Sequence, residues 1–194
     1  MRRAVFAAAA ILAGAVSAPL AVSAMPLVRL AQAASKHPAA PTIPETSDYI
    51  RASVMGDMFE VQAAKVAQAK SHNPDIQRFA AMMIREHGEI GDELAAILKQ
   101  ASFDFAPPTS LDSEHAAMVS ELNSLADASF DRSFLQKQIE AHEAALRLEN
   151  DYAKVGRDQP LRKFAAQTAP KVHAYLELAR QLYSRITRIA SRSR

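Results

Sequence analysis

The chain has 194 residues, of which 49% are hydrophobic and 23% charged, and it contains only five glycines. This composition favours a helical globular domain and argues against a disordered chain or a glycine-rich β fold. The sequence has no cysteine, which excludes disulfide bonds, thiolate metal sites and cysteine nucleophiles.

Residues 1–33 have the pattern of an export signal peptide. Two arginines follow the first methionine, residues 4–22 are rich in alanine, valine and leucine, and small residues mark cleavage sites after Ala24 and after Ala33. A retained membrane anchor is the alternative, because about 19 apolar residues can just span a bilayer. The two cleavage sites favour a cleaved signal. We therefore expect a periplasmic or otherwise exported protein with no stable membrane insertion after cleavage.

The first half of the remaining chain predicts a linker and two long helices. Residues 34–46 form a linker rich in proline and alanine. The first helix is expected to start from Ser47 as its N-cap and to run to Lys70. The second should start from Asn73 as its N-cap and run to Gln100, with a proline at the first helical position, where the missing N–H costs nothing. The turn between them is short, so the two helices should be antiparallel neighbours.

The second half predicts a crossing segment and three further helices. Residues 102–113 contain two adjacent prolines and should be non-helical. Gly156 is expected as a helix C-cap, and Pro170 should kink the helix that contains it. The short helix and the two long helices that follow are expected over residues 114–126, 129–155 and 159–189.

These elements together predict the fold class. Four long helices with two short links and one long central link are typical of an all-α, ferritin-like four-helix bundle with one crossover. In this chain the crossover should carry the short extra helix. We expect the bundle domain to span residues 47–190 and a basic tail to follow over residues 191–194.

The charges are unevenly distributed along the chain. Residues 34–156 contain 11 basic and 19 acidic residues, whereas residues 157–194 contain 9 basic and 2 acidic residues. A basic last helix that packs against acidic helices has its charge balanced within the bundle. No aromatic or glycine-rich segment is interleaved with the basic residues, so we expect no nucleic-acid partner.

Four polar side chains lie on or beside the apolar faces of the long helices. His87, His142 and Tyr175 are central on their faces, and Glu60 flanks its face by about 80°. Each lies roughly 13–16 residues into its helix, or about 20 Å along the axis. The middles of antiparallel helices stack at one level, so these four side chains should share one layer. Glu149 should lie about 10 Å further along its helix.

A metal site is one interpretation of this layer. Di-iron centres in ferritin-like proteins need two Glu-x-x-His motifs, and both are missing here because isoleucine precedes each central histidine by three residues. A mononuclear site remains open, since one carboxylate and two imidazoles suit iron, zinc or manganese. The candidate ligands are Glu60, His87 and His142, with Tyr175 and Glu149 as neighbours.

The second interpretation of the layer is structural. In it the two histidines are hydrogen-bonded by each other, by Tyr175 and by Glu60, and they only fix the register of the helices. The sequence contains no Ser/His/Asp triad, glycine-rich phosphate loop or nucleotide fingerprint. We therefore predict no catalytic residue and no organic cofactor.

Four short motifs with regular spacing give a family resemblance. They are Met58-Phe59-Glu60-Val61, Pro74-x4-Phe79-Ala80-x6-His87, Phe130-Asp131-x2-Phe134-Leu135-x6-His142-Glu143 and Phe164-Ala165-x4-Pro170-x4-Tyr175-Leu176. With them the chain resembles the exported bacterial proteins of the domain-of-unknown-function family numbered 4142. The resemblance covers about residues 47–182 and implies a ferritin-like bundle with histidine at both central positions. It also implies a histidine where this chain has Tyr175 and a second carboxylate where it has Gln62, and both departures count against a metal site.

Two hypotheses of function follow from the sequence. The leading one is a non-enzymatic, exported cell-envelope protein that acts through contacts with a protein partner of unknown identity, in stress or surface physiology. The alternative is a ferritin-like metal-binding or redox protein whose site lies in the middle of the bundle.

Overall fold

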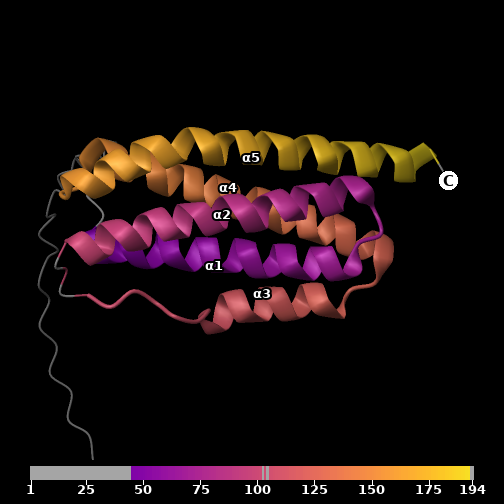
Figure 1. Ribbon diagram of the computed structural model, residues 1–194. Coiled ribbons are helices and arrows are strands. Elements are labelled where there is room, and N and C mark those ends of the chain that lie inside the picture. Colours follow the sequence, from indigo (N-terminus) through magenta and orange to yellow (C-terminus); the bar gives the residue numbers. More distant parts are fainter. Residues whose placement is uncertain (1–44, 102, 104, 193–194) are drawn as a thin grey trace, which may run out of the picture. The chain divides into compact units, whose positions relative to one another are not determined.

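The computed structural model describes residues 45–101, 103 and 105–192, and this part of the chain is all-helical, with five helices and no strand (Figure 1). The helices are α1 (Thr46–Lys70), α2 (Pro74–Gln100), α3 (Ser113–Ser124), α4 (Asp127–Val155) and α5 (Gln159–Arg192). The predicted signal peptide and nearly all of the predicted linker lie outside the described residues. None of the described helices is long and apolar enough to cross a membrane.

The four long helices pack in two pairs. α1 packs along α2, and α4 packs along α5, as the short link inside each pair predicts. The pairs meet where α1 contacts α4 and α2 contacts α5, while α3 lies against α1 (Figure 1). The five helices form one helical unit. Its middle is enclosed by helices that come from distant parts of the sequence.

The helix ends agree with the sequence at most positions and correct it at others. The side chain of Asn73 accepts a hydrogen bond of 2.9 Å from the backbone N–H of Asp75, so Asn73 caps α2 as expected. Ser47 does not cap α1, because the helix begins at Thr46, the residue before it, and Glu45 occupies the N-cap position. Asp112 caps α3 by accepting from the backbone N–H of His115. At the other end of the chain, α5 extends into the predicted tail.

Gly156 is the C-cap of α4, as predicted, but not because of a left-handed backbone. Its φ is −56°, and its backbone N–H donates to the carbonyl oxygen of Tyr152. A Cβ at this position would lie 2.6 Å from the Tyr152 ring. The ring itself stacks on Tyr49, with 3.8 Å between the centroids. Glycine is therefore required here by close packing rather than by backbone conformation.

The hydrophobic core runs along the inner faces of the long helices. Burying each of its large aliphatic or aromatic side chains stabilises the folded state by about 1.5–3 kcal/mol. The large side chains with almost no exposed surface are Tyr49, Tyr152, Phe59, Phe130, Phe134, Phe164, Ile50, Ile76, Met83, Ile90, Leu94 and Leu122. Within this apolar setting a few polar side chains are buried as well, and they form the candidate site.

Candidate metal centre

Three helices bring Glu60, His87 and His142 together in the middle of the unit. Glu60 comes from α1, His87 from α2 and His142 from α4, and their exposed fractions are 2%, 4% and 0%. One donor atom from each residue lies within 4.8 Å of the other two. We call this group the Glu/His/His cluster. The structure thus brings together the three candidate ligands that the sequence analysis placed in one layer.

His87 is held by a carboxylate that the sequence analysis did not single out. Its Nδ1 lies 2.9 Å from Oδ1 of Asp57, which is one helical turn before Glu60 on α1. A carboxylate accepts, so Nδ1 is the donor and the lone pair of Nε2 is left for another partner. Burial by itself lowers the pKa of His87, but the hydrogen bond to Asp57 and the charge of Glu60 outweigh it and raise that pKa.

His142 is held in the same way by the backbone of its own helix. Its Nδ1 lies 2.6 Å from the carbonyl oxygen of Gln138, one turn earlier on α4. A carbonyl can only accept, so Nδ1 carries the proton in this ring as well, and Nε2 is the free nitrogen. The Oε1 atom of Glu60 is 3.5 Å from this Nδ1, which is a long contact beside the bond to Gln138.

Three buried atoms of the cluster have no hydrogen-bond partner among the described residues. They are Nε2 of His87, Nε2 of His142 and Oε2 of Glu60. Buried polar atoms are usually paired, and each one left unpaired costs about 1–3 kcal/mol. These three atoms, two imidazole nitrogens and one carboxylate oxygen on residues of one buried cluster, are donors of the kind that a metal cation binds.

Tyr175 belongs to the layer but not to the hydrogen bonds of the histidines. Its ring centroid is 5.8 Å from that of His87 and 6.0 Å from that of His142. Its hydroxyl donates to Oε2 of Glu86 over 2.9 Å. The expectation that the two histidines are satisfied by each other and by Tyr175 is therefore wrong.

Glu149 lies apart from the cluster and has its own partners. The hydroxyl of Tyr49 donates to it over 2.7 Å, and the hydroxyl of Ser53 donates over 3.3 Å. Burial raises the pKa of Glu149 to about 7, and the charge of Asp57 adds to the shift. Glu149 is thus a buried acid next to the site and not a member of the three-residue group.

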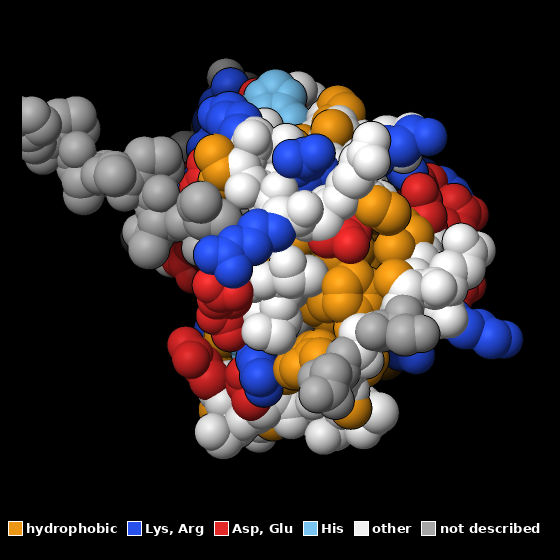
Figure 2. All heavy atoms as spheres, turned by 90° about the vertical axis from the view of Figure 1, so that its left-hand side faces the viewer, with side chains coloured by type: hydrophobic (Ala, Val, Ile, Leu, Met, Phe, Trp, Pro, Cys, Tyr) orange, Lys and Arg blue, Asp and Glu red, His pale blue; other side chains and the backbone are white. Residues whose placement is uncertain are grey.

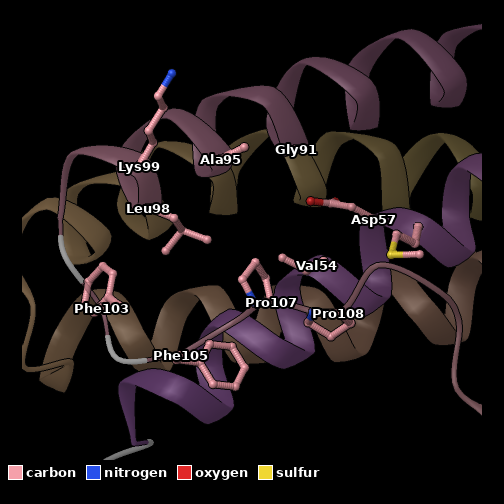
Figure 3. A pocket seen from close by; sticks show the side chains of 11 residues that line it. Val54, Asp57, Gly91, Ala95, Leu98, Lys99, Phe103, Phe105, Pro107 and Pro108 are labelled. Atoms are coloured by element: carbon pink, nitrogen blue, oxygen red, sulfur yellow. The ribbon is translucent and has the colours of Figure 1, made fainter.

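Two openings lead from the surface towards Asp57. The first, a cavity of about 630 Å³ between α1, α3 and α4, also has Glu60 and His87 in its wall, and we call it the α3 cavity. The second, a groove of about 470 Å³, lies between α1, α2 and the segment after α2 (Figure 3). Figure 3 shows its lining of Val54, Leu98, Phe103, Phe105 and two prolines. Figure 2 looks onto the end of the helices near this segment and shows hydrophobic side chains gathered there, with charged ones around them.

Comparison with solved structures identifies the fold. The chain is similar to a DUF305 fragment from Deinococcus radiodurans, with a TM-score of 0.64 and 16% identity over 75% of this chain and 99% of that one. It is similar to a putative secreted DUF305 protein from Streptomyces coelicolor, with a TM-score of 0.63 and 10% identity over 74% and 94% of the two chains. It is also similar to CopM in its Cu(II)-bound form, with a TM-score of 0.63 and 17% identity over 74% and 99%. At these identities the likeness concerns the fold alone.

Comparison by sequence identifies the family. Among curated proteins no relative matches the chain. The family description "Domain of unknown function (DUF4142)" matches residues 30–182, which is most of the chain and includes all three residues of the Glu/His/His cluster. The four spaced motifs and this match lead to one conclusion: the chain belongs to the DUF4142 family.

Proposed function

We propose that the protein binds one divalent transition-metal ion, Zn²⁺ or Cu²⁺, through Glu60, His87 and His142. The observation that supports this most directly is the set of three buried atoms, two imidazole Nε2 and one carboxylate Oε2, that have no partner among the described residues. Both histidines are already oriented by an acceptor on Nδ1, an arrangement usual for histidines that bind a metal through Nε2.

The donor chemistry selects the kind of ion. Two imidazoles and one carboxylate form a set that binds zinc, and imidazole also suits copper and iron. Copper(II) and zinc bind such sites more tightly than iron(II) or manganese(II) do, so they are favoured over the other two metals that the sequence allows. The fold neighbour CopM has been solved in Cu(II)-, Cu(I)- and silver-bound forms. The Glu/His/His cluster has no sulfur donor, so we assign it to Cu²⁺ rather than Cu⁺.

Metal analysis of the purified protein tests the proposal. Apo protein incubated with Zn²⁺ or Cu²⁺ and then desalted should retain one ion per chain. His87→Ala and His142→Ala should each abolish stoichiometric retention, and Glu60→Gln should weaken binding. His173→Ala is the matched control, because His173 is exposed on α5 and should leave retention unchanged. Wild-type protein without metal after desalting would disprove the proposal, and binding that survives both histidine substitutions would show that the ligands are assigned wrongly.

The ferritin-like class of the bundle and the export of the protein are also part of this proposal. Two helix pairs joined by one long segment that carries α3 support the ferritin-like bundle class. The signal-like first 33 residues support export, and one fold neighbour is described as a putative secreted protein. The mass of the mature protein tests export, because cleavage should leave Met25 or Ala34 as the first residue, and an intact N-terminus would contradict it.

The role of the bound ion follows from the burial of the site. An ion enclosed in the middle of the unit suits binding, storage or delivery to a partner protein in the cell envelope. A non-enzymatic protein that acts through protein contacts, which is the leading hypothesis from the sequence, is compatible with that role. If His142→Ala keeps its fold but loses a metal-dependent interaction with a partner protein, the bound ion and the protein contact belong to one function.

A further inference from the structure

The α3 cavity connects the buried cluster with the surface. Glu60 and His87 lie in its wall, and each has a buried atom without a partner among the described residues. Its outer part is formed by α1, α3 and α4 and includes four exposed acidic residues, Asp48, Asp112, Glu114 and Glu140. We call these four residues the acidic mouth.

The charge of the cavity is strongly one-sided. Of the described residues in its wall, seven carry a carboxylate, and Arg51 is the one lysine or arginine. The guanidinium of Arg51 is 5.0 Å from the centroid of the Phe105 ring, a cation–π contact with a residue of the other groove. A concave surface lined by charges of one sign focuses the electric field and raises the local concentration of the opposite ion.

The other groove lacks these properties. Among the described residues, its wall consists of apolar side chains and Gly91 apart from Asp57 and Lys99, and these two charges have opposite signs. Asp57 is the one carboxylate among the described wall residues, and the apolar side chains around it offer a hydrated cation no partner for the water that it loses. The two openings that reach Asp57 thus differ in electrostatics, although they are similar in size.

We propose that the α3 cavity is the entry route of the metal ion, and that the acidic mouth draws hydrated divalent cations towards Glu60 and His87 while it repels anionic metal chelates. This inference rests on the proposed function, since it concerns access to the same site. On this proposal the acidic mouth determines the rate of metal uptake, and the Glu/His/His cluster determines the equilibrium affinity.

Neutralising the mouth tests the electrostatic part. The triple variant Asp48→Asn/Glu114→Gln/Glu140→Gln removes three charges from the mouth and leaves Asp112 to cap α3. Uptake of Zn²⁺ by the apo protein, followed by stopped flow against a zinc indicator, should slow on the order of tenfold at low salt. The amount of zinc bound at equilibrium should stay at one per chain. The matched control, Asp92→Asn/Glu93→Gln/Asp151→Asn, removes three exposed charges outside the cavity and should stay within about twofold of wild type.

Obstructing each opening tests the route itself. Gly56 lines the α3 cavity and Gly91 lines the other groove, and a Cβ at either position meets no atom within 4 Å. Gly56→Leu and Gly91→Leu are therefore matched variants that should both fold, because leucine also favours the helix over glycine. Gly56→Leu should slow zinc uptake on the order of tenfold by occupying space that a hydrated ion must cross, while Gly91→Leu should leave the rate unchanged.

The outcomes separate this inference from the function on which it rests. If wild-type protein retains no zinc at equilibrium, the metal site itself is wrong. If it loads one ion but only Gly91→Leu slows uptake, the ion enters by the other groove and the inference is overturned. If every variant loads at the wild-type rate, entry does not pass through either opening, and the inference fails while the metal site stands.

Discussion

At the scale of single residues, the two histidines show how the chain prepares two nitrogens for a shared partner. Asp57 fixes Nδ1 of His87, and a backbone carbonyl fixes Nδ1 of His142. Both Nε2 atoms are thereby left free and buried, on residues that meet Glu60 in one cluster. The carboxylate of Asp57 also increases the electron density that Nε2 offers, because it partly accepts the Nδ1 proton. Gln138, whose side-chain amide is fully buried and without a described partner, adds a further polar group one turn from His142.

Substituting Asp57 tests whether the carboxylate that holds Nδ1 of His87 contributes to metal binding. Asp57→Asn keeps the shape and an oxygen acceptor for Nδ1 but removes the charge. We expect the affinity for Zn²⁺ to fall about 10- to 100-fold, as is usual when the partner of a metal-binding histidine is lost. Competition with a chelator of known affinity measures it. Asp92→Asn, at an exposed site on α2, is the control. An unchanged affinity in Asp57→Asn would mean that Asp57 has no part in metal binding.

The sequence could predict the three central residues but not their partners. Periodicity places His87 and His142 on apolar faces, and equal distances along antiparallel helices bring them to one level. Glu60 seemed to flank its face, yet it is buried, because α1 contacts α2, α3 and α4 and so has a wider buried face than one stripe. Asp57 was missed for the same reason. Its contact with His87 depends on how two helices face each other, which no single helical wheel contains.

At the scale of helices, packing determines details that local propensity does not. The interior of α2 and its capping asparagine follow directly from the sequence, whereas α1 starts before its best capping residue because Tyr49 and Ile50 in its first turns are fully buried. Gly156 is similar. Its identity signals a helix end, but the reason for it is the Tyr152 ring that stacks on Tyr49.

Substituting Gly156 should therefore destabilise the protein even though its backbone suits any residue. The added Cβ of Gly156→Ala meets the ring and the carbonyl oxygen of Tyr152, and the ring cannot move away without breaking its stack on Tyr49. We expect the free energy of unfolding to fall by about 1–3 kcal/mol, measured by urea denaturation of the metal-free protein. Gly91→Ala, in open space within α2, should instead be neutral or stabilise by up to about 1 kcal/mol. Equal effects of the two substitutions would contradict this account of Gly156.

At the scale of the whole molecule, the site and its neighbours place ionisable acids within the core, and these acids make the stability depend on pH. Glu149 and Asp57 both have raised pKa values, and burial is the largest cause for each. Glu149 therefore holds a proton in the folded state at a pH where the unfolded chain has already lost it, whereas Asp57 accepts the Nδ1 proton of His87. The free energy of unfolding then decreases as pH rises, because the folded state binds more protons than the unfolded state does.

Glu149 gives this effect a defined pH window. Its carboxyl ionises near pH 4.5 in the unfolded chain and near pH 7 in the folded one, so the metal-free protein should lose stability between these values, by about 3 kcal/mol from this group. Glu149→Gln keeps an oxygen that can accept from Tyr49 but cannot ionise. It should match wild type near pH 5 and be more stable above pH 7. Urea denaturation with a chelator present, at intervals from pH 5 to pH 8, measures both curves. Parallel curves would show that Glu149 does not carry the pH dependence, and a wild-type curve that rises with pH would show that its carboxyl is stabilised in the ionised form.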